Sequence, residues 1–475
     1  MSKLSHYSWS AVNKFGTQTI GFVGNILIAR QLSPEDYGLI AMLAIFLSIA
    51  MNFTESGFAD FLIRDPNSKE KDFATIFVHN IVFGIGFYFL LFFCAPLIAS
   101  FYKEPELISI TRVLGLSIIF KAICLTEFTR MRKELLFKNA SLIQIVSSLV
   151  SVSIAYIFAL LGWGYWALVI QAISLGMVNI IMIIAINKWT PVFHFNWSRY
   201  RVMRKFGNNM LLSYFTNQIG SNLYSVFVGK FYNSGILGYY NQAEKINKIS
   251  FYSVNSIILT TSYSLLAKEI DKVKRRKMYV SISNHFLFIH FIFSAFIIGG
   301  AYPIIEFLFG EQWIPTVPFL QLILLSFLFQ PLVTLNSNII KIENNSKLYR
   351  NLTFLRNGLI LLSLLITYTY TIYTILYGLI LARYFSAFVD AIYCGKYIDF
   401  RISDQLKITI AQALAPSISS VIAYFVIDVI ATKTLLLKLV LYALVFGVLF
   451  IVINRITRNK SYFMFLGKIK TFKIK

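Results

Sequence analysis

Residues 29–38 read ARQLSPEDYG, and residues 229–238 read GKFYNSGILG, at an ungapped spacing of 200 residues. Each stretch is a short polar connection between two long apolar runs. Residues of similar character match at this spacing: Phe15 with Phe215, Gln18 with Gln218, Arg30 with Lys230, and Gly38 with Gly238. The spacing therefore predicts that the chain contains an internal repeat.

Chance similarity between two apolar helices is the alternative reading of this match. The tripeptide KFG occurs at residues 14–16 and again at 205–207, which gives a competing spacing of 191. We prefer the spacing of 200 because it gives both segments the same inside-to-outside direction, as repeats of parallel orientation require.

The composition indicates that a lipid bilayer surrounds most of the chain. Of 475 residues, 57% are hydrophobic and only 14% are charged, which is too little polar surface for a soluble globule of this size. Apolar stretches of about 20 residues, the length of a membrane-spanning helix, recur along nearly the whole chain. The sequence predicts an all-α integral membrane protein with about fourteen transmembrane helices: 10–30, 37–63, 74–100, 107–129, 139–161, 164–187, 206–229, 236–267, 278–309, 314–340, 351–368, 372–395, 408–430 and 439–454.

The distribution of lysine and arginine predicts the orientation of these spans. With the N-terminus inside, cytoplasmic segments hold 32 of the 44 basic residues and the opposite face holds five. Short basic loops remain in the cytoplasm, so both termini are expected on the cytoplasmic side of the membrane. Seven basic residues fall within the spans: Lys14, Arg112, Lys121, Lys245, Lys248, Arg356 and Arg383.

The spans divide into two pseudo-symmetric lobes of six helices and a final helix pair. The longest connection is basic, lies on the predicted cytoplasmic side, and follows the sixth span. The predicted parts are an N-lobe at 1–187, a cytoplasmic linker at 188–205, a C-lobe at 206–395, and a helix pair with a basic tail at 396–475.

Several classes of function lack their sequence signals. The net charge of +23 is spread over short connections, so it reflects membrane topology and not a nucleic-acid partner. The cysteines and histidines show no metal-binding spacing, and the phosphate-binding pattern GxxxxGK[ST] does not occur. No outer loop exceeds about a dozen residues, a length too short for a catalytic domain. We expect no catalytic residue, no metal and no cofactor.

Polar residues inside the spans are the candidate site, because a charge in a bilayer is costly unless it faces water or a partner. In the first span, Lys14, Gln18 and Asn25 share one helical face. In the second span, Asn52, Ser56 and Asp60 recur every four residues, and Glu55 lies nearby. We predict a polar stripe on each helix.

Further polar groups occur in the seventh, eighth and twelfth spans. The seventh is rich in amides, including Gln218 and Asn222. The eighth carries Asn241, Glu244, Lys245 and Lys248; Glu244 precedes Lys248 by four residues, the favourable order for an ion pair. This pair is either local structure or, with the surplus Lys245, part of a cationic cavity. In the twelfth span, Arg383 and Asp390 lie seven apart on one face.

Three other basic residues within the spans are not assigned to the candidate site. Arg112 and Arg356 lie near span ends, where their long stems can reach the headgroups, so both are expected to be structural. Lys121 lies deeper and stays ambiguous. A modest excess of cations with many amides suits an anionic substrate that carries hydroxyl groups.

Residues 28–43, IARQLSPEDYGLIAML, and residues 235–246, GILGYYNQAEKI, resemble the two lobes of bacterial polysaccharide-exporting flippases. These are the Wzx-type proteins of the multidrug/oligosaccharidyl-lipid/polysaccharide superfamily, and the likeness covers roughly residues 8–395. The final helix pair fits the fourteen-helix members.

The resemblance implies transport of undecaprenyl-pyrophosphate-linked oligosaccharide units from the inner to the outer leaflet by alternating access. It implies that Lys245 and Lys248 bind the pyrophosphate with help from Lys14 or Arg383. The residues expected to line the same cavity are Gln18, Asn25, Gln218, Asn222 and Asn241, and Glu55, Asp60 or Asp390 are expected to bind a coupling cation. The second span offers Glu55 and Asp60 where lipid II flippases have a cation, which favours an O-antigen (lipopolysaccharide), capsule or exopolysaccharide unit.

The implied partners are the lipid-linked oligosaccharide, membrane lipids, and a polysaccharide polymerase with other envelope assembly proteins. Two alternatives stay open. One is a cation-coupled exporter of drugs or metabolites from the same superfamily, which needs a more apolar cavity and an essential embedded carboxylate. The other is a membrane-embedded polysaccharide polymerase or glycosyltransferase, which needs a large outer loop with catalytic acids or arginines.

Overall fold

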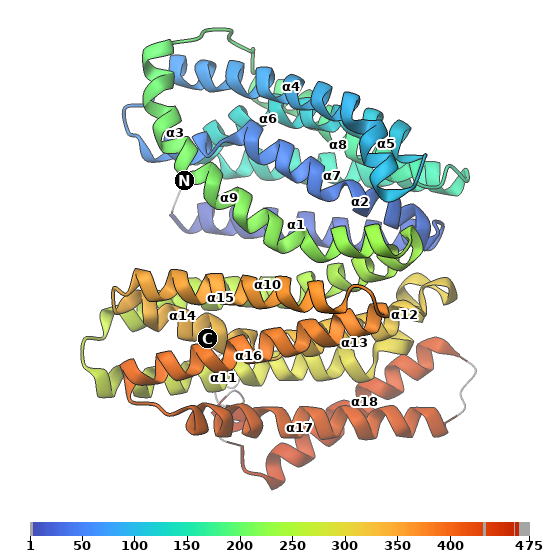
Figure 1. Ribbon diagram of the computed structural model, residues 1–475, viewed down its shortest axis with the longest axis vertical. Helices are drawn as coiled ribbons and strands as arrows, with labels where there is room; N and C mark the ends of the chain where they lie inside the picture. Colours follow the sequence, from blue (N-terminus) through green and yellow to red (C-terminus); the bar gives the residue numbers. More distant parts are fainter. Residues whose placement is uncertain (1–2, 431–433, 460, 465–475) are drawn as a thin grey trace. The chain divides into compact units, whose positions relative to one another are not determined.

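The computed structural model describes residues 3–430, 434–459 and 461–464; the side chains of residues 3–7, 206, 208–221 and 249–260 are not described. Throughout these described residues the regular structure is helical (Figure 1). The chain forms two compact units, Met1–Asn241 and Gln242–Lys475. The lobe boundaries expected from the sequence stay a prediction.

The described part of the first unit contains nine helices and the start of a tenth. Their bounds are α1 Lys3–Ala29, α2 Pro34–Glu55, α3 Phe58–Arg64, α4 Glu70–Tyr102, α5 Leu107–Leu114, α6 Leu116–Lys133, α7 Phe137–Leu160, α8 Trp166–Asn187, α9 Trp197–Phe231, and the first two turns of α10 Ser234–Lys268. The tight turn predicted between the fifth and sixth spans is confirmed, since it separates α7 from α8.

The second unit holds the rest of α10 and the remaining helices. Their bounds are α11 Lys272–Gly299, α12 Ala301–Phe309, the short 3-10 helix η1 Glu311–Trp313, α13 Thr316–Ser326, α14 Gln330–Ile342, α15 Ser346–Thr367, α16 Ile372–Ile398, α17 Ile402–Val429 and α18 Leu435–Ile456. A helix lies at each of the fourteen predicted spans.

In the described residues, ten helical segments are long and apolar enough to cross a membrane. The chain is therefore a multi-pass integral membrane protein. The other four predicted spans coincide with α1, α9, α10 and α15, which have 27, 35, 35 and 22 residues. Three of these four carry polar groups that the sequence assigns to a cavity.

Most residues of the connection SPEDYG, at 33–38, have a structural role. Ser33 caps α2: its hydroxyl accepts a hydrogen bond from the Asp36 amide, and the Asp36 carboxylate accepts one in return from the Ser33 amide, at 2.9 Å. The other carboxylate oxygen of Asp36 accepts from the Tyr165 amide at 2.8 Å. Asp36 thereby joins the start of α2 to the turn between α7 and α8.

The first turns of α2 and α10 make equivalent contacts at the spacing of 200 residues. A Cβ added to Gly38 would collide with the carbonyl of Ser234, and one added to Gly238 would collide with the carbonyl of Pro34. The helix caps also match, because the Asn233 side chain accepts from the Ile236 amide at 2.8 Å, as Ser33 does from Asp36. We call the pairing of Gly38 with Ser234 and of Gly238 with Pro34 the reciprocal glycine contact.

The polar stripe predicted along the second span is wrong as a continuous helical face. The helix α2 ends at Glu55, and Ser56 and Gly57 adopt left-handed backbone conformations with φ of 47° and 68° before α3 begins. Gly207 of α9 lies against this break, where a Cβ would approach the Ser56 carbonyl to 2.5 Å. Asp60 is therefore on a separate helix from Asn52.

Candidate functional site

The ion pair expected between two residues of the cationic segment of α10 is present. Lys248 pairs with Glu244, with 3.0 Å between the ammonium nitrogen and the carboxylate oxygen. The Lys248 side chain is 48% exposed, so the ion pair leaves much of it accessible. Lys245 lies between these two residues, directly after Glu244, so the segment contains two lysines and one carboxylate. The segment keeps a net positive charge.

Two amides on the same helix were not predicted. Gln242 and Asn247 are 0% and 1% exposed, and among the described residues neither side-chain amide has a hydrogen-bond partner. A buried amide without a partner is costly, so such a group usually binds water or a ligand. The sequence signal was their presence in a span, but burial without a partner is visible only in the structure.

The polar stripe of α1 lies away from the helix that α1 packs against. Gly16 and Gly24 face Ile145 and Val152 of α7, while Lys14 and Gln18 are exposed and Asn25 is half-buried. Helical spacing places Lys14, Gln18 and Asn25 together on the opposite face. Within the first unit, this face is therefore turned away from α7.

The remaining predicted residues of the first unit are spread over several helices. Asn222 and Asn241 are half-buried on α9 and α10. The side chain of Gln218 lies outside the described residues. Glu55 is half-buried at the end of α2, and Asp60 is exposed on α3.

Arg383 and Asp390 are both on α16 but have different partners. The guanidinium of Arg383 lies over the ring of Phe327, 3.7 Å from its centroid, and donates to the Ser326 hydroxyl at 3.2 Å. Asp390 is 1% exposed and pairs with Arg356 at 3.2 Å. A coupling cation at Asp390 would have to compete with this guanidinium.

The expectation that Arg356 reaches the headgroups is wrong. Its guanidinium also donates to the hydroxyls of Thr353 and Ser337, at 3.1 and 3.4 Å, so its charge is used inside the second unit. Arg356 thus has the structural role expected of it, but through contacts inside the protein.

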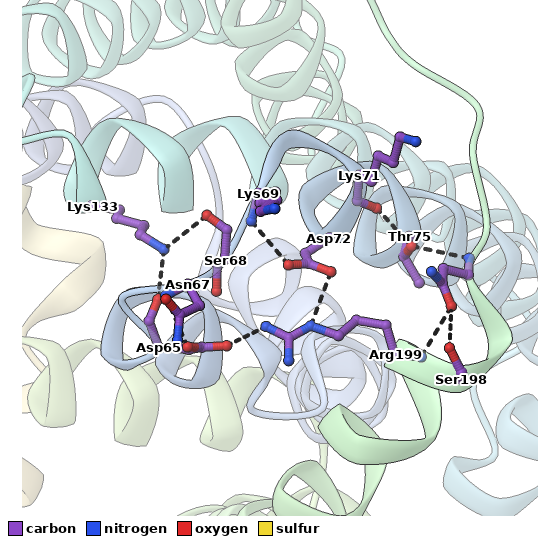
Figure 2. A network of polar contacts seen from close by, with 11 residues as sticks. Asp65, Asn67, Ser68, Lys69, Lys71, Asp72, Thr75, Lys133, Ser198 and Arg199 are labelled. Carbon is purple, nitrogen blue, oxygen red and sulfur yellow. Dashed lines mark hydrogen bonds and ion pairs between the residues drawn. The ribbon is translucent and has the colours of Figure 1, made fainter.

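A polar network fixes the predicted cytoplasmic linker to the first unit (Figure 2). Arg199 of α9 contacts two carboxylates: its Nε lies 3.1 Å from Asp72, and its Nη2 pairs with Asp65. Lys133 of α6 donates to the Asp65 carbonyl at 2.8 Å. The hydrogen bond from the Asn67 amide, aided by Arg199, lowers the pKa of Asp65. We call Arg199, Asp65 and Asp72 the Arg199 network.

The sequence comparisons connect this arrangement to known proteins. Residues 27–318 match a family model described as polysaccharide biosynthesis protein. The chain belongs to this family. It is a family of Wzx-like flippases, which are transporters and not enzymes.

Three relatives align with about two thirds or more of the chain. The teichuronic acid biosynthesis protein TuaB of Bacillus subtilis is 23% identical over 73% of this chain and 72% of its own length. The succinoglycan biosynthesis transport protein ExoT of Rhizobium meliloti is 23% identical, over 67% of this chain and 65% of its own length. The lipopolysaccharide biosynthesis protein WzxC of Escherichia coli is 21% identical, over 67% and 66%.

Solved structures of two transporters share the fold. The lipid II flippase MurJ in an inward closed conformation has a TM-score of 0.69 at 16% identity, over 94% of this chain and 98% of its own. A multidrug resistance MATE transporter in an inward-facing conformation has a TM-score of 0.63 at 15% identity, over 80% and 94%. At this level of identity the likeness concerns the fold alone.

Proposed function

We propose that this flippase moves undecaprenyl-pyrophosphate-linked oligosaccharide units from the inner to the outer leaflet for assembly of a surface polysaccharide. The cationic, amide-rich segment of α10 carries the proposal. Two lysines supply charge for a pyrophosphate, and the buried amides of Gln242 and Asn247 supply donors and acceptors for sugar hydroxyls. Relatives named for teichuronic acid, succinoglycan and lipopolysaccharide support a glycan precursor as the substrate class.

We further propose that the chain has fourteen spans, in two lobes of six and a final pair, with both termini in the cytoplasm. The helices α1, α9, α10 and α15 complete the count. At about 1.5 Å per residue, even the 22 residues of α15 cover about 30 Å, the thickness of the hydrocarbon core. Their polar residues lower the hydropathy of these helices without shortening them.

The reciprocal glycine contact supports alternating access as the mechanism. It brings the first turns of two repeat-related helices together, with backbone against backbone. Such a contact needs no side chain to rearrange, so it can form and separate as a unit. We propose that it closes the extracytoplasmic side while the cavity is open to the cytoplasm, and that Glu55 or Asp60 binds a coupling cation.

Complementation of a strain that lacks this gene tests the assignment of the site. Replacing Lys245 and Lys248 together by alanine should abolish export of the surface polysaccharide at normal protein level, with lipid-linked precursor accumulating inside. Lys268→Ala is the matched control, because Lys268 is exposed at the far end of the same helix. Unimpaired export in the double variant would show that the site is elsewhere.

A drug or metabolite exporter is the second candidate, since the fold is shared with a MATE transporter. The same strains distinguish the two. If deletion leaves the surface polysaccharide intact but raises sensitivity to cationic drugs, the exporter is correct and the flippase proposal is wrong.

A further inference from the structure

The final helix pair leaves a cavity where it meets the second unit's outer helix ends. The cavity has a volume of about 530 Å³. Its walls come from the last turns of α17, the first turns of α18, the bend between α11 and α12, and the start of α13. On the predicted topology, all of these lie in the extracytoplasmic half of the membrane, and Asp428 and Lys438 lie at or just beyond the outer ends of their spans.

Internal hydrogen bonds fix the walls of this cavity. Tyr442 is 1% exposed and donates to the Phe296 carbonyl at 2.8 Å, while Gln321 donates to the Ile298 carbonyl at 2.9 Å. Gly299 lies so close to Ser420 and Tyr442 that a Cβ would collide with both side chains. These contacts therefore fix the part of the cavity wall that Gly299, Gln321 and Tyr442 form.

Two opposite charges line the cavity. Asp428 is in the last turn of α17 and Lys438 is in the first turn of α18. Neither forms an ion pair with any residue that the structure describes. The helix dipoles add to both charges, because a C-terminus is a negative pole and an N-terminus is a positive pole. The cavity lining thus contains one anionic and one cationic group.

A ligand with both charges fits this arrangement better than an anion or a neutral sugar. An ammonium group suits Asp428 and the aromatic faces of Tyr302 and Tyr424, which are 42% and 46% exposed. A phosphate suits Lys438 at the start of α18. A primary ammonium also donates hydrogen bonds to a carboxylate, which a quaternary ammonium does not.

We propose that this cavity binds the phosphoethanolamine headgroup of a membrane phospholipid, with Asp428 on the ammonium and Lys438 on the phosphate. The bound lipid would hold the final helix pair against the bend between α11 and α12. This site is separate from the cationic segment of α10 and does not depend on the transported substrate.

Thermal unfolding of the purified, delipidated full-length chain tests the proposal. Phosphatidylethanolamine should raise the midpoint more than phosphatidylglycerol or phosphatidylcholine with the same acyl chains. Asp428→Asn and Lys438→Gln should each weaken phosphatidylethanolamine binding by about tenfold, the loss of one charged hydrogen bond. Asp404→Asn and Lys407→Gln, at the opposite end of α17, are the matched controls and should bind as the wild type does.

Soluble phosphoethanolamine separates headgroup recognition from acyl-chain binding in the unmodified protein. In excess, it should displace phosphatidylethanolamine and reduce its stabilising effect. Equal stabilisation by the three lipids, retained affinity in both variants, or no competition by the soluble headgroup would each overturn the proposal. The competition arm needs no variant, so it holds even if a substitution impairs folding.

Discussion

Replacing Gly238 by alanine should hold the extracytoplasmic side of this flippase open. A Cβ added at Gly238 would lie about 1 Å too close to the Pro34 carbonyl oxygen, because real Cβ atoms essentially never come nearer than 3.0 Å to such an atom. The obstacle is backbone, so no rotamer change relieves it. The first turns of α2 and α10 must therefore separate.

The cost follows from the geometry. Overpacking of a close contact costs about 1–3 kcal/mol, which moves a two-state equilibrium by about 5–150-fold. Gly38→Ala should have an effect of similar size, because its Cβ meets the Ser234 carbonyl in the equivalent way. In the double variant the effects of the two substitutions on this equilibrium should be less than additive, since a contact that is already open cannot be opened again.

A cysteine at position 241, one turn beyond Gly238, reports this opening. In a background with Cys94 replaced by serine, a membrane-impermeant thiol reagent added outside the cell should label Asn241→Cys faster when Gly238→Ala is present, and export should fall. Gly21→Ala is the control, because a Cβ at Gly21 has nothing within 4 Å. If Gly238→Ala labels and exports as Gly21→Ala does, the reciprocal glycine contact does not close this side.

Three further predictions concern charged groups. Arg199→Ala should lower the stability of the chain in detergent by about 1–3 kcal/mol, because it removes charged hydrogen bonds to two carboxylates; Arg201→Ala, at an exposed neighbour, should change the unfolding midpoint little. The lowered pKa of Asp65 contributes stability above its ordinary value of 3.8, and this contribution is lost as pH falls through the lowered value. Between pH 7 and 3, Asp65→Asn should therefore show a smaller loss of thermal stability than the wild type, and an equal loss would contradict this account. Arg356→Leu should cost about 3–5 kcal/mol by leaving a buried carboxylate unpaired, and adding Asp390→Leu should restore most of it; export by a stable double variant would exclude Asp390 as the coupling site.

The spans were predictable because the lipid bilayer favours apolar residues along the whole length of a spanning helix. Apolar length and the polar breaks located a helix at each of the fourteen expected positions. The break after Glu55 was not predictable, because the residues on both sides keep helical spacing. What ends the helix is the left-handed backbone at Ser56 and Gly57, with Gly207 of a distant helix against it.

The candidate site was predictable only where its contacts are local. The pairing of Glu244 with Lys248 is confirmed, because a spacing of four residues sets the distance. Arg383 and Asp390 share a helix face, yet each binds residues from other segments, and sequence spacing contains no information about those. Gln242 and Asn247 were missed for the same reason.

A charged residue in a membrane span therefore indicates function only after its local partners are known. Asp390 and Arg356 are both charges within predicted spans, where an unpaired charge is costly. Their ion pair offsets this cost without any ligand. The segment of α10 differs, because its two buried amides, Gln242 and Asn247, have no hydrogen-bond partner in the described part of the chain. Contacts among the described residues do not account for these two amides, and the sugar hydroxyls of the proposed substrate would supply partners for both.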